Sequence, residues 1–173
     1  MTRTRVNFFL VAVLVCGGCA TAAKAKPEAM IAQINVNAPV HKSLSDVNVT
    51  VVGGQETSVM ILAQIADEDF AQALRESIMQ SGLFRKALEK GLATYQLHAF
   101  IAQINHPIFG MSSTVIVSME VNYTLARTNP KEVVWQKAVV STYSAPSLQL
   151  AKEGAARKNI EQAIQEISSL KLD

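Results

Sequence analysis

The residues of this chain with the most reactive side chains are two cysteines near its amino terminus, Cys16 and Cys19. They follow an uncharged, largely apolar run, residues 6–15, which is preceded by Arg3 and Arg5. Basic residues, a short apolar run and small residues at a cleavage site are together typical of a secretory signal peptide. The run falls short of the ~20 residues that a membrane-spanning helix needs. The sequence therefore predicts export and removal of this segment.

Cys19 directly follows Gly17 and Gly18, and this arrangement resembles the signal sequences of bacterial lipoproteins. In that family a glyceride is attached to the cysteine thiol, the peptidase cuts just before the cysteine, and the new amino terminus is acylated, here with palmitate as the expected chain. Cys16 does not fit as the modified residue, because the bulky Val15 precedes it. The sequence departs from the family pattern at Cys16, where leucine is usual. Ordinary secretion, with cleavage after Ala22, is the alternative.

The predicted signal peptide carries the net charge of the chain. Removing residues 1–18 takes away Arg3 and Arg5, so the 16 basic residues fall to 14 and equal the 14 acidic ones. A neutral domain has no general electrostatic attraction to nucleic acid or to anionic lipid, so no nucleic-acid partner is expected. With Cys16 removed and Cys19 lipidated, no disulfide can form and the core must hold the fold alone.

The remaining chain is predicted to form one domain. Residues 1–18 are the signal peptide, residues 19–28 are a lipidated tether of small and polar residues, and residues 29–173 are a single α+β domain. The tether is predicted because its residues have no hydrophobic period. Residues 31–36 could form a strand that Pro39 follows.

The hydrophobic pattern predicts a strand, a helix, three strands and a helix, over residues 47–52, 67–82, 94–104, 113–126, 132–143 and 146–170. Asp67 is the expected N-cap of the first helix and Gly82 its end. Each helix has one apolar face and so has the strand over 113–126. We therefore expect an α+β two-layer sandwich, in which two helices cover one face of a mainly antiparallel four-stranded sheet.

Three short segments carry a resemblance for the domain: Ser81-Gly82-Leu83-Phe84, Tyr95-Gln96-Leu97-His98-Ala99 and Val134-Trp135-Gln136-Lys137. With the acylated cysteine and the order of elements, they resemble small envelope lipoproteins of Gram-negative bacteria with a compact α/β domain. The layout is similar to that of the LPS-assembly lipoprotein. The resemblance implies the fold more than a function, although several members of this group act as accessories to envelope transport machines.

No group of residues predicts catalysis, a metal site or a cofactor. The histidines, His41, His98 and His106, have no spacing to one another or to acidic residues that suits a metal ion. No nucleophile elbow, phosphate-binding loop or dinucleotide fingerprint occurs. Gly53-Gly54 is expected to form a turn. We therefore predict a protein that is not an enzyme, with no catalytic residue, metal or cofactor.

The segment between the strands over 94–104 and 113–126 is unusually apolar for a loop, and it contains Ile108, Phe109 and Met111. These side chains either fold back to close the end of the core, or they contact a partner protein or a membrane.

The expected function is that of a non-catalytic outer-membrane lipoprotein, anchored by lipid on Cys19 on the periplasmic side. Ala20, directly after Cys19, favours the outer membrane in the lipoprotein pattern. The protein would be an accessory to envelope assembly or transport through contacts with an envelope protein. The alternative is a binding module for a lipid or a glycan, with a cavity lined by Val115, Val117 and Met119.

Overall fold

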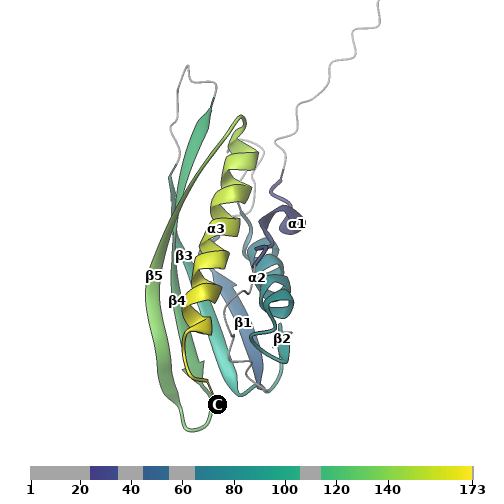
Figure 1. The fold of residues 1–173 in the computed structure, drawn as a ribbon, viewed down its shortest axis with the longest axis vertical. Coiled ribbons are helices and arrows are strands. Elements are labelled where there is room, and N and C mark those ends of the chain that lie inside the picture. The colour runs from purple at the N-terminus through teal and green to yellow at the C-terminus, as the bar shows by residue number, and fades with distance from the viewer. Residues whose placement is uncertain (1–23, 35–44, 55–64, 106–113, 173) are drawn as a thin grey trace, which may run out of the picture.

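The computed structural model describes residues 24–34, 45–54, 65–105 and 114–172. Within these residues the chain forms α1 (Pro27–Met30), β1 (Asp46–Val52), α2 (Asp67–Ser81), β2 (Lys86–Leu88), β3 (Tyr95–Asn105), β4 (Val115–Arg127), β5 (Glu132–Ala145) and α3 (Leu148–Ser168). The strands form one sheet, in the order β2-β1-β3-β4-β5. Helices α2 and α3 cover the same face of this sheet (Figure 1). The predicted two-layer α+β sandwich is therefore confirmed.

The sheet itself differs from the predicted one. β1 pairs in parallel with both β2 and β3, whereas β3–β4 and β4–β5 are antiparallel. The prediction of a mainly antiparallel, four-stranded sheet is wrong, because the sheet is mixed and has a fifth strand, β2. The connection from β1 to β3 contains α2, and a long crossover of this kind joins parallel strands. At three residues, β2 is too short to have a hydrophobic period of its own.

The core lies between the sheet and the two long helices. The alternation predicted for β4 is confirmed, since every second side chain from Val117 to Leu125 is buried. Phe70, Leu74 and Ile78 of α2 are buried over β1 and its neighbours. The buried stripe of α3 packs on β4 and β5, and consists of Ala156, Ile160, Ala163, Ile164 and Ile167. Burying each large aliphatic side chain contributes roughly 1.5–3 kcal/mol, so this interface is the main support of the fold.

The ends of the helices follow local signals in the sequence. Gly82 adopts the left-handed conformation, with φ 66°, directly after α2, as predicted. Ser147 is the N-cap of α3, where its Oγ accepts a hydrogen bond from the Leu150 N–H at 3.3 Å. Asp67 is not the N-cap of α2: the helix begins at Asp67, whose carboxylate accepts the N–H of Gly54.

The strands and α3 run between two ends of the molecule, the proximal pole and the hairpin pole. The proximal pole comprises the end of β3, the start of β4, the end of β5 and the first turn of α3, residues 101–105, 114–119 and 143–151. The hairpin pole comprises β2 with its flanking residues and the turn between β4 and β5, residues 85–90 and 127–132. In Figure 1 the proximal pole is at the top and the hairpin pole at the bottom, and α3 runs from the first toward the second.

Candidate functional site

The residues that the sequence predicted for lipid attachment and contact lie outside the described parts of the chain. These are Cys19 and the group Ile108, Phe109 and Met111. They stay predictions. Lys24 is the first residue of the chain that the structure describes. The residue before the apolar segment is Asn105, the last of β3, which belongs to the proximal pole.

The first described residues, 24–32, form a segment that is packed into the domain. Ala25, Met30 and Ala32 are all buried in the main core. Part of this segment, residues 24–28, belongs to the stretch that we expected to be a tether. The sequence offered little sign of this packing, because the buried residues are few and follow no period.

Polar contacts fix this segment to the first two turns of α3. The Lys26 N–H donates to Glu153 Oε1 at 3.0 Å, and Gln149 Nε2 donates to the same oxygen at 2.9 Å. Gln149 Nε2 also donates to the Lys24 carbonyl at 3.2 Å. The Glu153 side chain is buried, so these two donors satisfy a carboxylate that would be costly to leave unpaired.

The same segment also contacts α2. Lys24 Nζ lies 3.0 Å from Asp69 Oδ2 at the start of that helix. The Ala32 N–H donates to Ser77 Oγ at 2.9 Å, and the Ser77 hydroxyl donates to the Ala73 carbonyl at 2.7 Å. Residues 24–32 therefore contact both α2 and α3.

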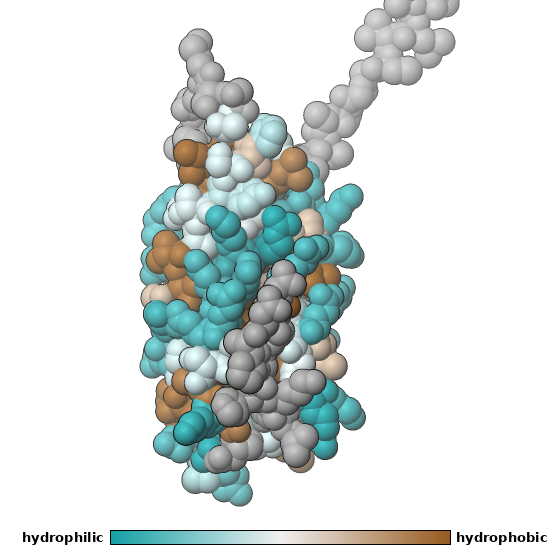
Figure 2. Space-filling model, viewed as in Figure 1, coloured by the Kyte–Doolittle hydropathy of each residue, from teal (hydrophilic) through white to brown (hydrophobic). Residues whose placement is uncertain are grey.

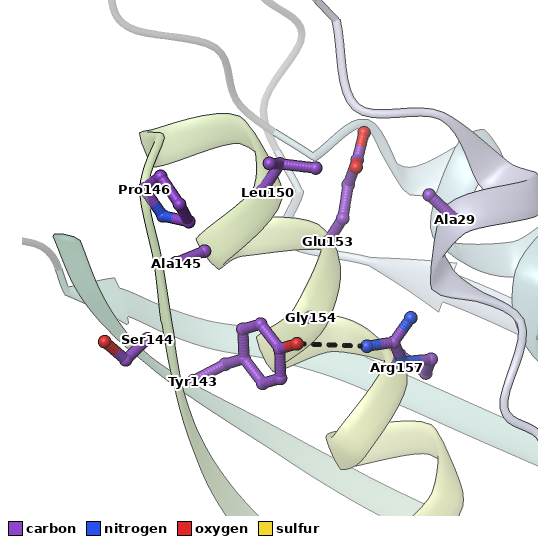
Figure 3. Close-up of a pocket in the computed structure, with 9 residues that line it drawn as sticks. All are labelled: Ala29, Tyr143, Ser144, Ala145, Pro146, Leu150, Glu153, Gly154 and Arg157. Carbon is purple, nitrogen blue, oxygen red and sulfur yellow. Dashed lines mark hydrogen bonds between the residues drawn. The ribbon is translucent and has the colours of Figure 1, made fainter. Parts of the chain in front are cut away.

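A cavity of about 250 Å³ lies where this segment meets the proximal pole (Figure 3). Its wall is built around Tyr143, whose ring lies against the backbone of Gly154. Arg157 Nη2 donates to Tyr143 Oη at 3.4 Å, and the guanidinium carbon is 5.6 Å from the ring centroid. The residues that line the cavity are Ala29, Tyr143, Ser144, Ala145, Pro146, Leu150, Glu153, Gly154 and Arg157. This volume is below the usual range of small-molecule sites, roughly 300–1,000 Å³.

A buried polar cluster links α3 to the sheet. The Tyr123 hydroxyl donates to Asn159 Oδ1 at 2.9 Å, and Asn159 Nδ2 donates to the Val139 carbonyl at 2.8 Å. Ser141 Oγ donates to the Ala155 carbonyl at 2.8 Å. Burial strongly raises the pKa of Tyr123, so its phenol stays neutral. Because Tyr123 and Asn159 are fully buried, no substrate reaches them and the cluster positions α3.

The histidines and the Gly53-Gly54 pair noted in the sequence either have a structural role or lie outside the described residues. His98 is exposed on β3, with Nδ1 3.4 Å from the Thr50 carbonyl, and His41 and His106 lie outside the described residues. Gly53 has φ 94° just after β1, and a Cβ there would lie 2.5 Å from the Ile101 carbonyl. Only glycine adopts this conformation at that position without strain, and such a conformation is typical of a turn.

The residues expected to line a ligand cavity are part of the core. Val117 and Met119 are fully buried and Val115 is partly buried against the same cluster. Trp135 packs on Tyr123, with ring centroids 6.1 Å apart. In the described parts of the chain, no three His, Cys, Asp or Glu residues are placed to hold a metal ion, and no helix is long and apolar enough to span a membrane.

Comparison with known proteins finds no protein-family model and no curated protein sequence that matches this chain. Its fold is similar to several solved structures. A protein of the DUF330 family from Xanthomonas campestris has a TM-score of 0.57 and 13% identity, over 74% of this chain and 86% of that one. A candidate lipoprotein from Caulobacter crescentus has a TM-score of 0.51 and 11% identity, over 71% and 88% of the two chains. The PelC dodecamer from Paraburkholderia phytofirmans has a TM-score of 0.52 and 14% identity, over 75% and 91%.

At these identities the similarity is one of fold alone. Small lipoproteins of Gram-negative bacteria have a similar fold. The resemblance predicted from the sequence is therefore confirmed at the level of the fold.

Proposed function

We propose that this protein is a non-catalytic lipoprotein, anchored on the periplasmic side of the outer membrane by lipid on Cys19, which assists envelope assembly or transport through protein–protein contacts. The observation that carries the proposal is the packing of residues 24–32 against α2 and α3, so soon after Cys19 in the sequence. A lipid on that cysteine would hold the folded domain itself close to the membrane. The fold shared with a candidate lipoprotein supports the same conclusion.

The sheet supports a role in protein contacts. Helices cover one face of it, and the other face carries partly or fully exposed side chains, among them Phe100, Asn122 and Val140. β5, with 14 residues, is an edge strand of the sheet. A long edge strand can pair with a strand of another chain. For this fold, the PelC dodecamer is a precedent for contacts between copies of one chain.

The absence of catalysis is part of the proposal. Among the described residues, no three His, Cys, Asp or Glu side chains are placed to hold a metal ion, and the strongly shifted group, Tyr123, is fully buried. The cavity beside Tyr143 is small, and its one acidic residue, Glu153, accepts two hydrogen bonds within the protein.

The test is a crosslinking pull-down from membranes of cells that make the full chain, a Cys19→Ala variant or a Cys16→Ala variant. Cys16→Ala is a matched control, because it makes the same substitution within the predicted signal peptide. We expect an envelope protein to be captured in stoichiometric amount with wild type and Cys16→Ala, and to be lost with Cys19→Ala. Absence of any protein partner, together with a lipid or glycan that co-purifies in native mass spectrometry, would instead favour a binding module.

A further inference from the structure

The described chain begins at one end of the molecule. The Lys24 carbonyl and the Lys26 N–H are bound by Gln149 and Glu153, which lie in the first two turns of α3. Those turns begin at the proximal pole. The chain that leads back to Cys19 therefore leaves the domain beside the proximal pole.

The distance from this point to Cys19 is limited by the length of the chain. Four residues separate Cys19 from Lys24, and the five steps from one to the other span at most about 18 Å when fully extended. Helix α3, with 21 residues, is about 30 Å long and leads away from this point toward the hairpin pole. A lipid on Cys19 therefore holds the proximal pole nearer to the bilayer than the hairpin pole.

The chemistry of the proximal pole suits a lipid surface. Residues 101–105, 114–119 and 143–151 contain no charged side chain. Two large apolar side chains project there, Ile116 with 53% and Leu150 with 52% of its surface exposed. Figure 2 shows apolar residues close to this end, and others along the side and at the lower end of the molecule. Exposed apolar side chains are stabilised when they enter the boundary of headgroups and acyl chains.

We propose that the proximal pole rests on the phospholipid surface of the bilayer, with Leu150 and Ile116 at the boundary of headgroups and acyl chains. This inference rests on the proposed lipid attachment at Cys19. Two apolar side chains bind a membrane weakly by themselves, but a short tether makes the contact intramolecular and gives it a high effective concentration. The hairpin pole then points away from the membrane.

The test uses single cysteines introduced into the full chain, which is exported and processed in a Gram-negative host. Once Cys16 is removed and Cys19 is lipidated, the mature chain has no free thiol, so an introduced cysteine is the one site for an environment-sensitive fluorophore. The pole variants are Leu150→Cys and Ile116→Cys. Matched controls are Leu92→Cys and Val133→Cys near the hairpin pole, at residues that are 96% and 57% exposed, and Val140→Cys on the open face of the sheet.

Each labelled protein is reconstituted into vesicles of phosphatidylethanolamine and phosphatidylglycerol that contain nitroxide-labelled lipid. We expect quenching at positions 150 and 116 to be at least twofold greater than at positions 92, 133 and 140. Equal quenching at all five positions, or the strongest quenching at position 140, would overturn the proposal. So would labels at 150 and 116 that are shielded from water but not quenched by the lipid, since a second copy or another protein would then cover this pole. Fluorescence of Trp135, the single tryptophan, verifies that each variant is folded.

Flotation of the same vesicles separates this inference from the proposed function. Protein that floats with lipid on Cys19, but shows no preferential quenching at the proximal pole, leaves the anchor intact and refutes the orientation. Protein that carries no lipid on Cys19 and does not float refutes both.

Discussion

The proximal pole and the hairpin pole belong to the same sheet, yet they present different residues. The proximal pole has no charged side chain in its strand ends and first helical turn, and buried contacts hold the amino-terminal segment beside it. The hairpin pole is rich in charge, from Arg85, Lys86, Glu89, Lys90, Arg127, Lys131 and Glu132. Its ion pairs lie at the surface and join Arg85 to Asp46, Lys90 to Glu89, and Arg127 to Glu132.

This difference indicates what each pole can do. Exposed ion pairs are weak because water screens them, so the charged side chains of the hairpin pole cost little to keep in solvent. The proximal pole gains from leaving water where Ile116 and Leu150 are exposed, because both side chains are large and apolar. The two ends therefore differ most in charge, and the proposed orientation depends on that difference.

The largest expected effect concerns the packing of residues 24–32. Met30 is fully buried, so Met30→Ala should lower the free energy of unfolding by about 2–5 kcal/mol. Met79→Ala is the matched control, because Met79 is 46% exposed at the end of α2 near β2, and it should cost less than about 1 kcal/mol. Urea unfolding of the mature chain, followed by Trp135 fluorescence, measures both. Similar losses in the two variants would mean that residues 24–32 are not part of the cooperative core.

A smaller effect is expected where Tyr143 lies on α3. A Cβ at Gly154 would overlap the Tyr143 ring, so Gly154→Ala should destabilise the protein by roughly 1–3 kcal/mol. In a Tyr143→Ala background the overlap is gone, and the same substitution should become neutral or stabilise by up to about 1 kcal/mol, since alanine favours helix over glycine. A double-mutant cycle in urea tests this reversal of sign. Equal effects in the two backgrounds would contradict the packing of Tyr143 against Gly154.

The smallest effect is expected at the hairpin pole. The pKa of Asp46 is held below its ordinary value of 3.8 by the hydrogen bond from Arg85 and by its charge, with N–O distances of 2.8 and 2.9 Å. Because the folded pKa is the lower one, the pair stabilises the protein above pH 3.8 and loses this contribution as the pH falls through the folded pKa. The difference in stability between wild type and Asp46→Asn should therefore be small at neutral pH and vanish in acid. The same difference in stability should also shrink in 1 M salt, because salt screens the ion pair. A difference in stability that grows as the pH falls would contradict this prediction.

Much of the fold could be predicted from local patterns. The strict alternation over β4 and the stop at Gly82 need no tertiary information, because each follows from the geometry of one strand or one turn. The direction of β1 was the main error. A strand, a helix and a strand in sequence is itself a signal for parallel pairing, and it outweighs the antiparallel arrangement of β3, β4 and β5. β2 has no such signal, because it is a strand only through its pairing with β1.

The site was less predictable than the fold. Ala25 and Met30 are buried because α2 and α3 happen to meet over them, and that meeting cannot be read from the sequence around them. The uncharged stretches at 114–119 and 143–151 are visible in the sequence, but only the pairing of Val115 with Ala145 brings them to one end of the sheet. The predictions for Cys19 and for Ile108, Phe109 and Met111 await experiment.

The central claim is that lipid on Cys19 holds this domain to a membrane, and the most direct test is the mass of the amino-terminal peptide. The full chain would be produced in a Gram-negative host, purified from membranes, digested, and analysed by mass spectrometry. The account predicts a peptide that begins at Cys19 and carries a glyceride on the thiol and an acyl chain on the amino group. An unmodified peptide that begins at Ala23, after cleavage at Ala22, would contradict it.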